Sequence, residues 1–191
     1  LVTYGISFGC IYLCREDGIW IMPFFAAAFV IVIIFLAIEN QKGVFKKAVI
    51  MLLPFVLSAG IISGYCYMNY IHYGRFIVSD FTSGEFKAAY GALTSIEQKE
   101  WDPLVSVPED VRESVYKVSP SFAQLEDNIK SGWIENSWKN QHDFSSGSFY
   151  WALRESAAQD GYYKNADSAR EFYEQLTNEI PTAVNEGKLK T

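Results

Sequence analysis

The stretch that decides the fold is IWIMPFFAAAFVIVIIFLAI, residues 19–38, which contains no charged side chain. As an α-helix it would extend about 30 Å, the thickness of the hydrocarbon core of a bilayer. A second charge-free run covers residues 48–71 and is interrupted only by Pro54 and small residues. Buried helices of a large soluble protein are the alternative, but such helices seldom lack charge for so long. We therefore predict two full membrane spans.

Residues 1–14 are also apolar and resemble the end of a further span. The predicted fold class is an all-α membrane protein, with a transmembrane helix bundle of two full spans and one partial span at residues 1–75. A small, mainly α soluble domain is predicted at residues 76–191. Because the chain opens at Leu1 inside an apolar stretch, we interpret it as part of a longer protein, and we do not expect a cleaved signal peptide.

Charged residues, like apolar ones, are distributed unevenly between the two halves of the chain. Residues 1–71 carry four basic and three acidic side chains, whereas residues 72–191 carry 12 basic and 19 acidic ones, within an overall net charge of −6. Nucleic-acid binding needs clustered Lys and Arg, which this acidic half lacks, so no nucleic-acid partner is expected. All three cysteines lie in the apolar half, so the soluble half can form no disulfide of its own.

Loop charges predict the orientation of the spans. The connection at residues 39–47 contains Lys42, Lys46 and Lys47, whereas the turn at residues 15–18 contains only Arg15 as a basic residue. Excess Lys and Arg mark the cytoplasmic side. We therefore expect an integral protein of the cell membrane with residues 39–47 inside and residues 76–191 in the extracytoplasmic space.

Two GxxxG patterns lie in the apolar half, Gly5 with Gly9 and Gly60 with Gly64. Small residues one turn apart let two helix backbones approach closely in lipid. Glycine is also simply common in membrane helices, but two such faces suit a helix bundle better than isolated anchors.

The soluble half shows helical spacing of apolar residues and little strand alternation. Pro103 and Pro108 bracket an extended connection. Helices are predicted from a capping box at residues 82–85 to about Ile96, after Pro108, from the Ser119-Pro120 pair, over residues 148–160, and from Asn165 until Pro181 ends or kinks the last one.

Few residues suggest chemistry. No P-loop, GxGxxG, GxSxG, HExxH or CxxC occurs, and we predict no metal site and no cofactor. His142-Asp143 is the nearest approach to a metal or base pair, but an adjacent pair in a polar loop is more often plain surface. Pairs of carboxylates could serve glycoside chemistry, although most are expected on solvated helix faces.

The soluble half is rich in tryptophan, which offers two interpretations. Sugars stack on such rings, and a small helical domain also uses them to fill its core, which we favour. The residues are Trp101, Trp133, Trp138 and Trp151.

Arg15 is the one candidate site residue, because it lies with Glu16 and Asp17 between two apolar segments. Charges at membrane depth tend to be functional. An interfacial turn, in which Arg15 reaches toward lipid headgroups, is the simpler alternative.

Residues 14–24, CREDGIWIMPF, resemble a segment of polytopic bacterial membrane proteins of the GT-C glycosyltransferase type, in which a charged turn is followed by an apolar span. The resemblance covers roughly the first 40 residues. The stretches around Trp101-Asp102-Pro103, Val118-Ser119-Pro120 and residues 151–155 resemble a recurring extracytoplasmic domain of uncharacterised membrane proteins.

The resemblance implies transfer of a sugar from a lipid-linked phosphosugar, with Arg15 as a contact for the lipid-linked phosphate. The catalytic acidic residue of such enzymes lies in an early loop that has no counterpart here, so no catalytic residue is assigned. The alternative is a non-catalytic membrane protein whose outer domain binds a partner or an envelope glycan through aromatic residues. A transporter part is a weaker third hypothesis. The lipid bilayer is the one partner that all three share.

Overall fold

The computed structural model describes residues 1–14, 18–38, 43–130, 143–145 and 147–191. Within these residues every regular element is a helix, and the chain divides into two compact units. We name Leu1–Thr82 the apolar unit and Ser83–Thr191 the acidic unit. The predicted all-α class, with apolar helices first and a helical region after them, is confirmed.

The apolar unit contains α1 (Val2–Cys14), the short 3₁₀ turn η1 (Gly18–Trp20), α2 (Ile21–Ile38), α3 (Val44–Met51) and α4 (Leu53–Tyr73). The candidate membrane spans are Gly18–Ile38 and Val44–Tyr73, both long and apolar enough to cross a bilayer. No residue of α2 is buried by the protein. A helix that is apolar all round, and of which the protein only partly covers one stripe, is suited to lipid and not to water.

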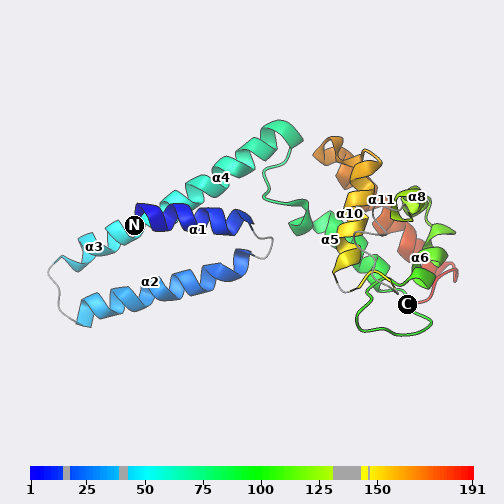
Figure 1. The fold of residues 1–191 in the computed structure, drawn as a ribbon, viewed down its shortest axis with the longest axis horizontal. Coiled ribbons are helices and arrows are strands. Elements are labelled where there is room, and N and C mark those ends of the chain that lie inside the picture. The colour runs from blue at the N-terminus through cyan, green and yellow to red at the C-terminus, as the bar shows by residue number, and fades with distance from the viewer. Residues whose placement is uncertain (15–17, 39–42, 131–142, 146) are drawn as a thin grey trace. The chain divides into compact units, whose positions relative to one another are not determined.

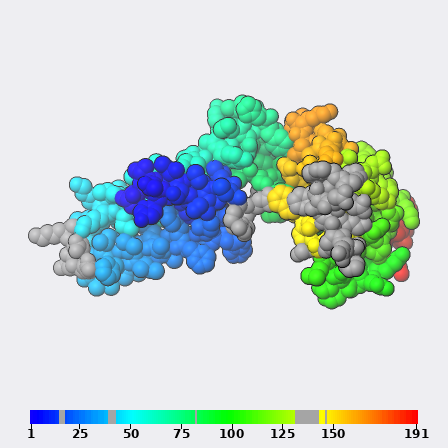
Figure 2. Space-filling view, in the orientation of Figure 1, coloured from blue at the N-terminus to red at the C-terminus, as the bar shows by residue number. Residues whose placement is uncertain are grey.

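Helix α1 is a shorter apolar helix that packs along α4 (Figure 1). Figure 2 shows α1 and α2 side by side on one face of this unit, where Phe8 stacks on Phe25 with ring centroids 4.2 Å apart. Phe25 in turn lies 4.5 Å from the ring of Phe55 on α4, and Phe29 lies 5.3 Å from the same ring. Aromatic contacts therefore join all three apolar helices.

The second span differs from the predicted range of residues 48–71. It begins at Val44 and runs to Tyr73, with a break at Leu52 between α3 and α4. Pro54, near the start of α4, has no backbone N–H, so it cannot donate to the carbonyl of Ile50 as a helix interior requires. Lys46 and Lys47, assigned to the connecting loop from sequence, instead lie in the first turn of α3.

The exit from α4 is fixed by a left-handed glycine. Gly74 has φ of 92° and donates its N–H to the carbonyls of Asn69 and Tyr70, which ends the helix. The amide of Asn69 donates to the carbonyl of Ile77 at 2.7 Å. This bond holds Ile77 against α4, and the compact apolar unit extends to Thr82.

The acidic unit contains α5 (Gly84–Thr94), α6 (Glu109–Tyr116), α7 (Pro120–Ala123), α8 (Glu126–Ile129), α10 (Ser148–Gln159), the 3₁₀ turn η3 (Tyr162–Lys164) and α11 (Ala166–Asn185). Helix α11 packs against α5 and α7, and α10 packs against α8. The fully buried side chains that fill the core include Phe86, Leu93, Phe122, Leu125, Phe149, Leu153 and Leu176.

The helix ends in this unit follow the local sequence. Ser83 accepts a hydrogen bond from the N–H of Phe86, and Asn165 accepts one from the N–H of Ser168, so both act as N-caps. Ser119 caps α7, whose first residue is Pro120, as predicted. Gly161, with φ of 81°, follows the end of α10, also as predicted.

Pro181 does not end α11, so of the two outcomes predicted for this proline, an end or a kink, the end does not occur. The helix continues to Asn185. Ile180 and Ala183 on either side of Pro181 are buried, so packing of the last turn outweighs the loss of one backbone hydrogen bond. The chain then turns at Gly187, and Lys188 donates its N–H to the carbonyl of Ala183.

Candidate binding surface

The most distinctive exposed feature of the acidic unit is the connection between α5 and α6. We name residues 98–107 the Trp101 turn. Its tip carries Trp101 and Leu104, whose exposed fractions are 79% and 64%. Large apolar side chains this exposed are informative because folding has not removed them from water. The core role that the sequence analysis favours for the tryptophans is wrong for Trp101.

Hydrogen bonds within the turn hold its tip in place. The carboxylate of Asp102 accepts from the N–H of Leu104 at 2.8 Å, and its carbonyl accepts from the N–H of Val105 at 3.2 Å. The amide of Gln98 crosses the base, where its nitrogen donates to the carbonyl of Val105 and its oxygen accepts from the N–H of Asp102. A closed set of local bonds therefore presents the two apolar side chains together.

Buried side chains fix the far end of the turn. Val107 is fully buried and Val105 is 7% exposed, whereas residues 99–104 are exposed. The N–H of Lys99 also donates to the carboxylate of Asp110 on α6 at 3.0 Å. The turn is thus attached to the core on one side and to a helix on the other.

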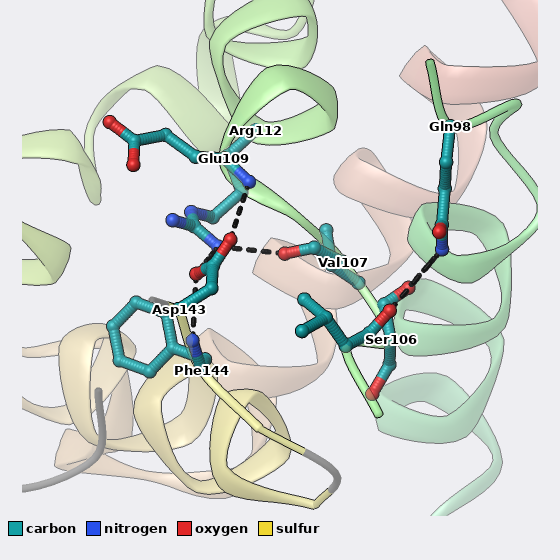
Figure 3. A network of polar contacts seen from close by, with 8 residues as sticks. Gln98, Ser106, Val107, Glu109, Arg112, Asp143 and Phe144 are labelled. Atoms are coloured by element: carbon teal, nitrogen blue, oxygen red, sulfur yellow. Dashed lines mark hydrogen bonds and ion pairs between the residues drawn. The ribbon is translucent and has the colours of Figure 1, made fainter. Parts of the chain in front are cut away.

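A buried ion pair supports the start of α6, where the turn ends (Figure 3). Arg112 is 4% exposed and donates from Nη1 to the carboxylate of Asp143 at 2.8 Å and to the carbonyl of Val107 at 2.7 Å. Asp143 also accepts from the N–H of Glu109 at 2.8 Å and from the N–H of Phe144 at 2.7 Å. The carboxylate therefore caps α6 and balances a buried guanidinium at once.

The same guanidinium lies over two aromatic rings. Its central carbon is 4.9 Å from the centroid of Phe144 and 5.7 Å from that of Phe149. The Asp143 carboxylate therefore has a structural role, because it pairs with the buried guanidinium that contacts these rings. Asp143 is not the plain surface residue that its loop position suggested, and His142, its neighbour, lies outside the described residues.

The sequence held one signal for this ion pair that we missed. Arg112 lies three residues before Val115 and next to Val111, so a charge falls inside an apolar helical stripe. Such a charge needs a buried partner. Nothing in the sequence indicated which carboxylate would supply it, because Asp143 lies 31 positions away.

Two further polar clusters engage other carboxylates of the acidic unit. Glu179 accepts from the hydroxyls of Ser119 and Ser121 at 2.5 and 2.8 Å, so it reinforces the cap of α7. Lys130 bridges Glu113 and Glu126 at 2.5 and 2.7 Å. The hydrogen bond from Lys130 lowers the pKa of Glu113, and burial raises the pKa of Tyr116.

Two open hollows border α11. One, of about 320 Å³, lies between α5 and α11 and includes Glu85 and Glu174, and the other, of about 340 Å³, includes Glu179 and Glu186. Each hollow has two glutamates, as acid and base chemistry on a sugar would require. Both are open to solvent, and Glu179 already caps α7. Within the described ranges no group of three or more His, Cys, Asp or Glu side chains could hold a metal ion.

Arg15, the one site residue predicted from sequence, lies outside the described residues, as do Glu16 and Asp17. Gly18, which follows them, is buried, and a side chain there would meet the backbone oxygen of Tyr12 at 2.7 Å. The charged turn thus ends at a position where only glycine fits.

The remaining tryptophans separate into two groups. Trp151, on α10, is 39% exposed, so it is not a core residue either. Trp133 and Trp138 lie outside the described residues.

The two GxxxG patterns have different environments. A Cβ at Gly5 would meet the carbonyl oxygen of Pro54 at 2.8 Å, and one at Gly9 would meet Ile61 at 3.2 Å. Neither Gly60 nor Gly64 has an atom of the described chain within 4 Å of such a Cβ. The hydroxyl of Ser58 donates to the carbonyl of Gly5 at 2.8 Å, so the first pattern is a true helix contact.

Comparison with known proteins adds no relative. No family model, curated protein or solved structure matches the chain.

Proposed function

We propose that the chain is the membrane-embedded part and the extracytoplasmic domain of a polytopic membrane protein, and that the acidic unit is a non-catalytic contact module. The single observation that supports this function is the hydrogen-bonded Trp101 turn, which exposes two large apolar side chains. An aromatic ring and an aliphatic group on a fixed loop suit a ligand with an apolar face, such as a glycan or a protein partner.

The use of the carboxylates favours contact over catalysis. Asp143 is bonded to Arg112, Glu179 caps α7, and Glu113 pairs with Lys130. Catalytic carboxylates need a cleft that excludes water and holds a substrate, whereas the hollows along α11 are open.

Photo-crosslinking tests the contact module in the full chain. We would place p-benzoylphenylalanine at Trp101 and, as the matched control, at Glu171, an exposed position on α11. Irradiation of membranes should give an adduct from position 101 and none from position 171. Equal labelling at the two positions, or no adduct at position 101, would contradict the proposal.

The orientation is part of the same proposal: residues 39–47 face the cytoplasm and residues 76–191 the outside. Its support is the lysine excess of the first connection. With Cys10 and Cys14 replaced by Ala, Glu171→Cys should react with a membrane-impermeant thiol reagent on intact cells. Reaction only after the cells are opened would reverse the orientation.

A second candidate is a membrane glycosyltransferase-like enzyme that uses a lipid-linked phosphosugar, with Arg15 near the phosphate. The observation that favours it is the packing of Gly18 against Tyr12, because the resembling families place a charged turn ending in glycine before a span. The complete reading frame should then show several further spans and an acidic residue in an early outer loop. A reading frame with only the present spans would exclude this candidate.

A further inference from the structure

We infer that the Trp101 turn inserts its tip into the headgroup region of the bilayer that the same chain spans. The inference rests on the proposed function, because it names the partner of the same surface. It identifies that partner as a lipid interface and not a glycan or a protein.

The chemistry of the tip fits this partner. Trp101 combines a large apolar ring with one N–H donor, and tryptophan is enriched where a bilayer changes from headgroups to acyl chains. Leu104, three residues later and 64% exposed, is purely apolar. Both side chains lie at one end of a turn whose other end is buried, so a shallow insertion leaves the rest of the unit in water.

The charges of the turn select the type of lipid surface. Trp101 is flanked by two acids, Glu100 and Asp102, and Lys99 is the one basic residue of the turn, so the tip carries no basic cluster. Attraction to anionic lipids requires several Lys or Arg. The apolar side chains must therefore supply the contact, and a zwitterionic phosphatidylcholine surface suffices.

A contact of only two side chains can be effective because the same chain is attached to the membrane through its candidate spans. Two side chains alone would bind a vesicle weakly, but the candidate spans keep the bilayer within reach of the acidic unit at all times. Binding then becomes an intramolecular event with a high effective concentration. A freely soluble domain would need a larger apolar surface or a lipid anchor for the same result.

Bromolipid quenching tests the inference. The full chain is reconstituted in phosphatidylcholine vesicles with and without brominated acyl chains, and its emission is compared with that of Trp101→Phe and of the control Trp151→Phe. The difference between wild type and each variant isolates the emission of the replaced residue. We expect the Trp101 contribution to be quenched about twofold more than the Trp151 contribution, as an interfacial position requires.

A second variant and a change of salt concentration test whether the quenching comes from apolar insertion of the turn. Leu104→Asp should reduce the quenching of Trp101, and helical circular dichroism should remain unchanged because both side chains are exposed. Raising the salt concentration should leave the quenching unchanged, since no ionic contact is involved.

Equal quenching of Trp101 and Trp151 overturns the lipid inference. If position 101 then still gives a glycan or protein adduct in the crosslinking experiment, the contact module stands with a different partner. If neither adduct nor quenching is found, both proposals fail.

Discussion

Helices α2 and α11 are similar in length, with 18 and 20 residues, yet α2 buries no residue and α11 buries seven. The difference lies in how apolar side chains are distributed around the helix. In α2 they cover every side, whereas in α11 they form one stripe opposite charged residues such as Arg170 and Glu174. The distribution, more than the amount of apolar surface, shows what surrounds a helix.

The two units also stabilise their folds differently. In the apolar unit a glycine pair lets α1 and α4 approach, and one hydroxyl joins them. In the acidic unit a core of rings and aliphatic side chains encloses one ion pair. Substitutions in each unit should therefore act through different physical terms, and five of them test this contrast.

The largest effect is expected from Asp143→Ala. The change leaves Arg112 buried without its carboxylate and removes the cap of α6, so we expect the free energy of unfolding of the acidic unit to fall by about 3–5 kcal/mol. Denaturant titration followed by circular dichroism measures it. The control Asp167→Ala removes an exposed partner of Arg170 and should change stability by less than about 1 kcal/mol. A similar loss in both variants would contradict the assigned role of the ion pair.

Gly5→Val should give the next largest effect. The new side chain meets the backbone of Pro54 and the Cβ of Leu57 at under 3 Å, and overpacking of this kind costs about 1–3 kcal/mol. Gly60→Val is the matched control, because that position has open space in the described structure. Resistance of the full chain to unfolding in denaturing detergent should fall for the first variant only. If the second variant is equally destabilised, another helix covers that face.

Ser58→Ala should have a smaller effect. The hydroxyl donates to the carbonyls of Gly5 and Pro54, and hydrogen bonds between membrane helices contribute on average about 0.6 kcal/mol. Ser63→Ala, an exposed serine on the same helix, serves as the control. The same detergent titration measures the effect. If Ser58→Ala lowers the resistance to unfolding more than Gly5→Val does, hydrogen bonding contributes more than close packing, contrary to the prediction.

The smallest effect is expected from Glu113→Gln. Lys130 lowers the pKa of Glu113 in the folded state, so the ion pair stabilises the fold above the unfolded pKa of about 4.3 and is lost as the pH falls through the lower folded value. The free energy of unfolding of the wild type should be slightly larger than that of the variant at pH 7. In acid the two values should become equal. Both side chains are about half exposed, which keeps the difference small.

Asp160→Asn provides a contrast of opposite sign. Burial raises the pKa of Asp160, so its charged form disfavours folding at neutral pH. This variant should be more stable than wild type at pH 7 and equal to it in acid. The melting temperature measured against pH should show Glu113→Gln below the wild type and Asp160→Asn above it at pH 7. If both variants shift the melting temperature in the same direction, the assigned pKa shifts are contradicted.

The helices could largely be predicted from the sequence because their signals are local. Ser119 and Asn165 cap helices as expected, and Gly161 follows the end of α10. The cap of α5 is Ser83, one residue after the first residue of the predicted capping box. The stop signal of Pro181 fails because the buried last turn of α11 outweighs it. Tertiary context overrides propensity in such cases.

The candidate surface could be predicted only in part, because exposure is not a local property. The sequence identified Trp101 as an aromatic candidate but assigned it to the core, and it gave no role to Leu104. Periodicity identifies a buried face on a helix, but an irregular turn has no periodicity to read. The partner of Arg112 was equally hidden, since contacts between distant residues depend on the whole fold.

The break at Leu52 separates a length of helix that matches a bilayer, α4, from the shorter helix α3 before it. An unbroken helix from Val44 to Tyr73 would measure about 45 Å and would overshoot the hydrocarbon layer by about 15 Å, a mismatch that demands strong tilt. The 21 residues of α4 alone measure about 31 Å and match that layer. Leu52 itself keeps right-handed helical angles, with φ of −75° and ψ of −16°, so α3 continues from α4 and carries Lys46 and Lys47 beyond the length that matches the hydrocarbon layer.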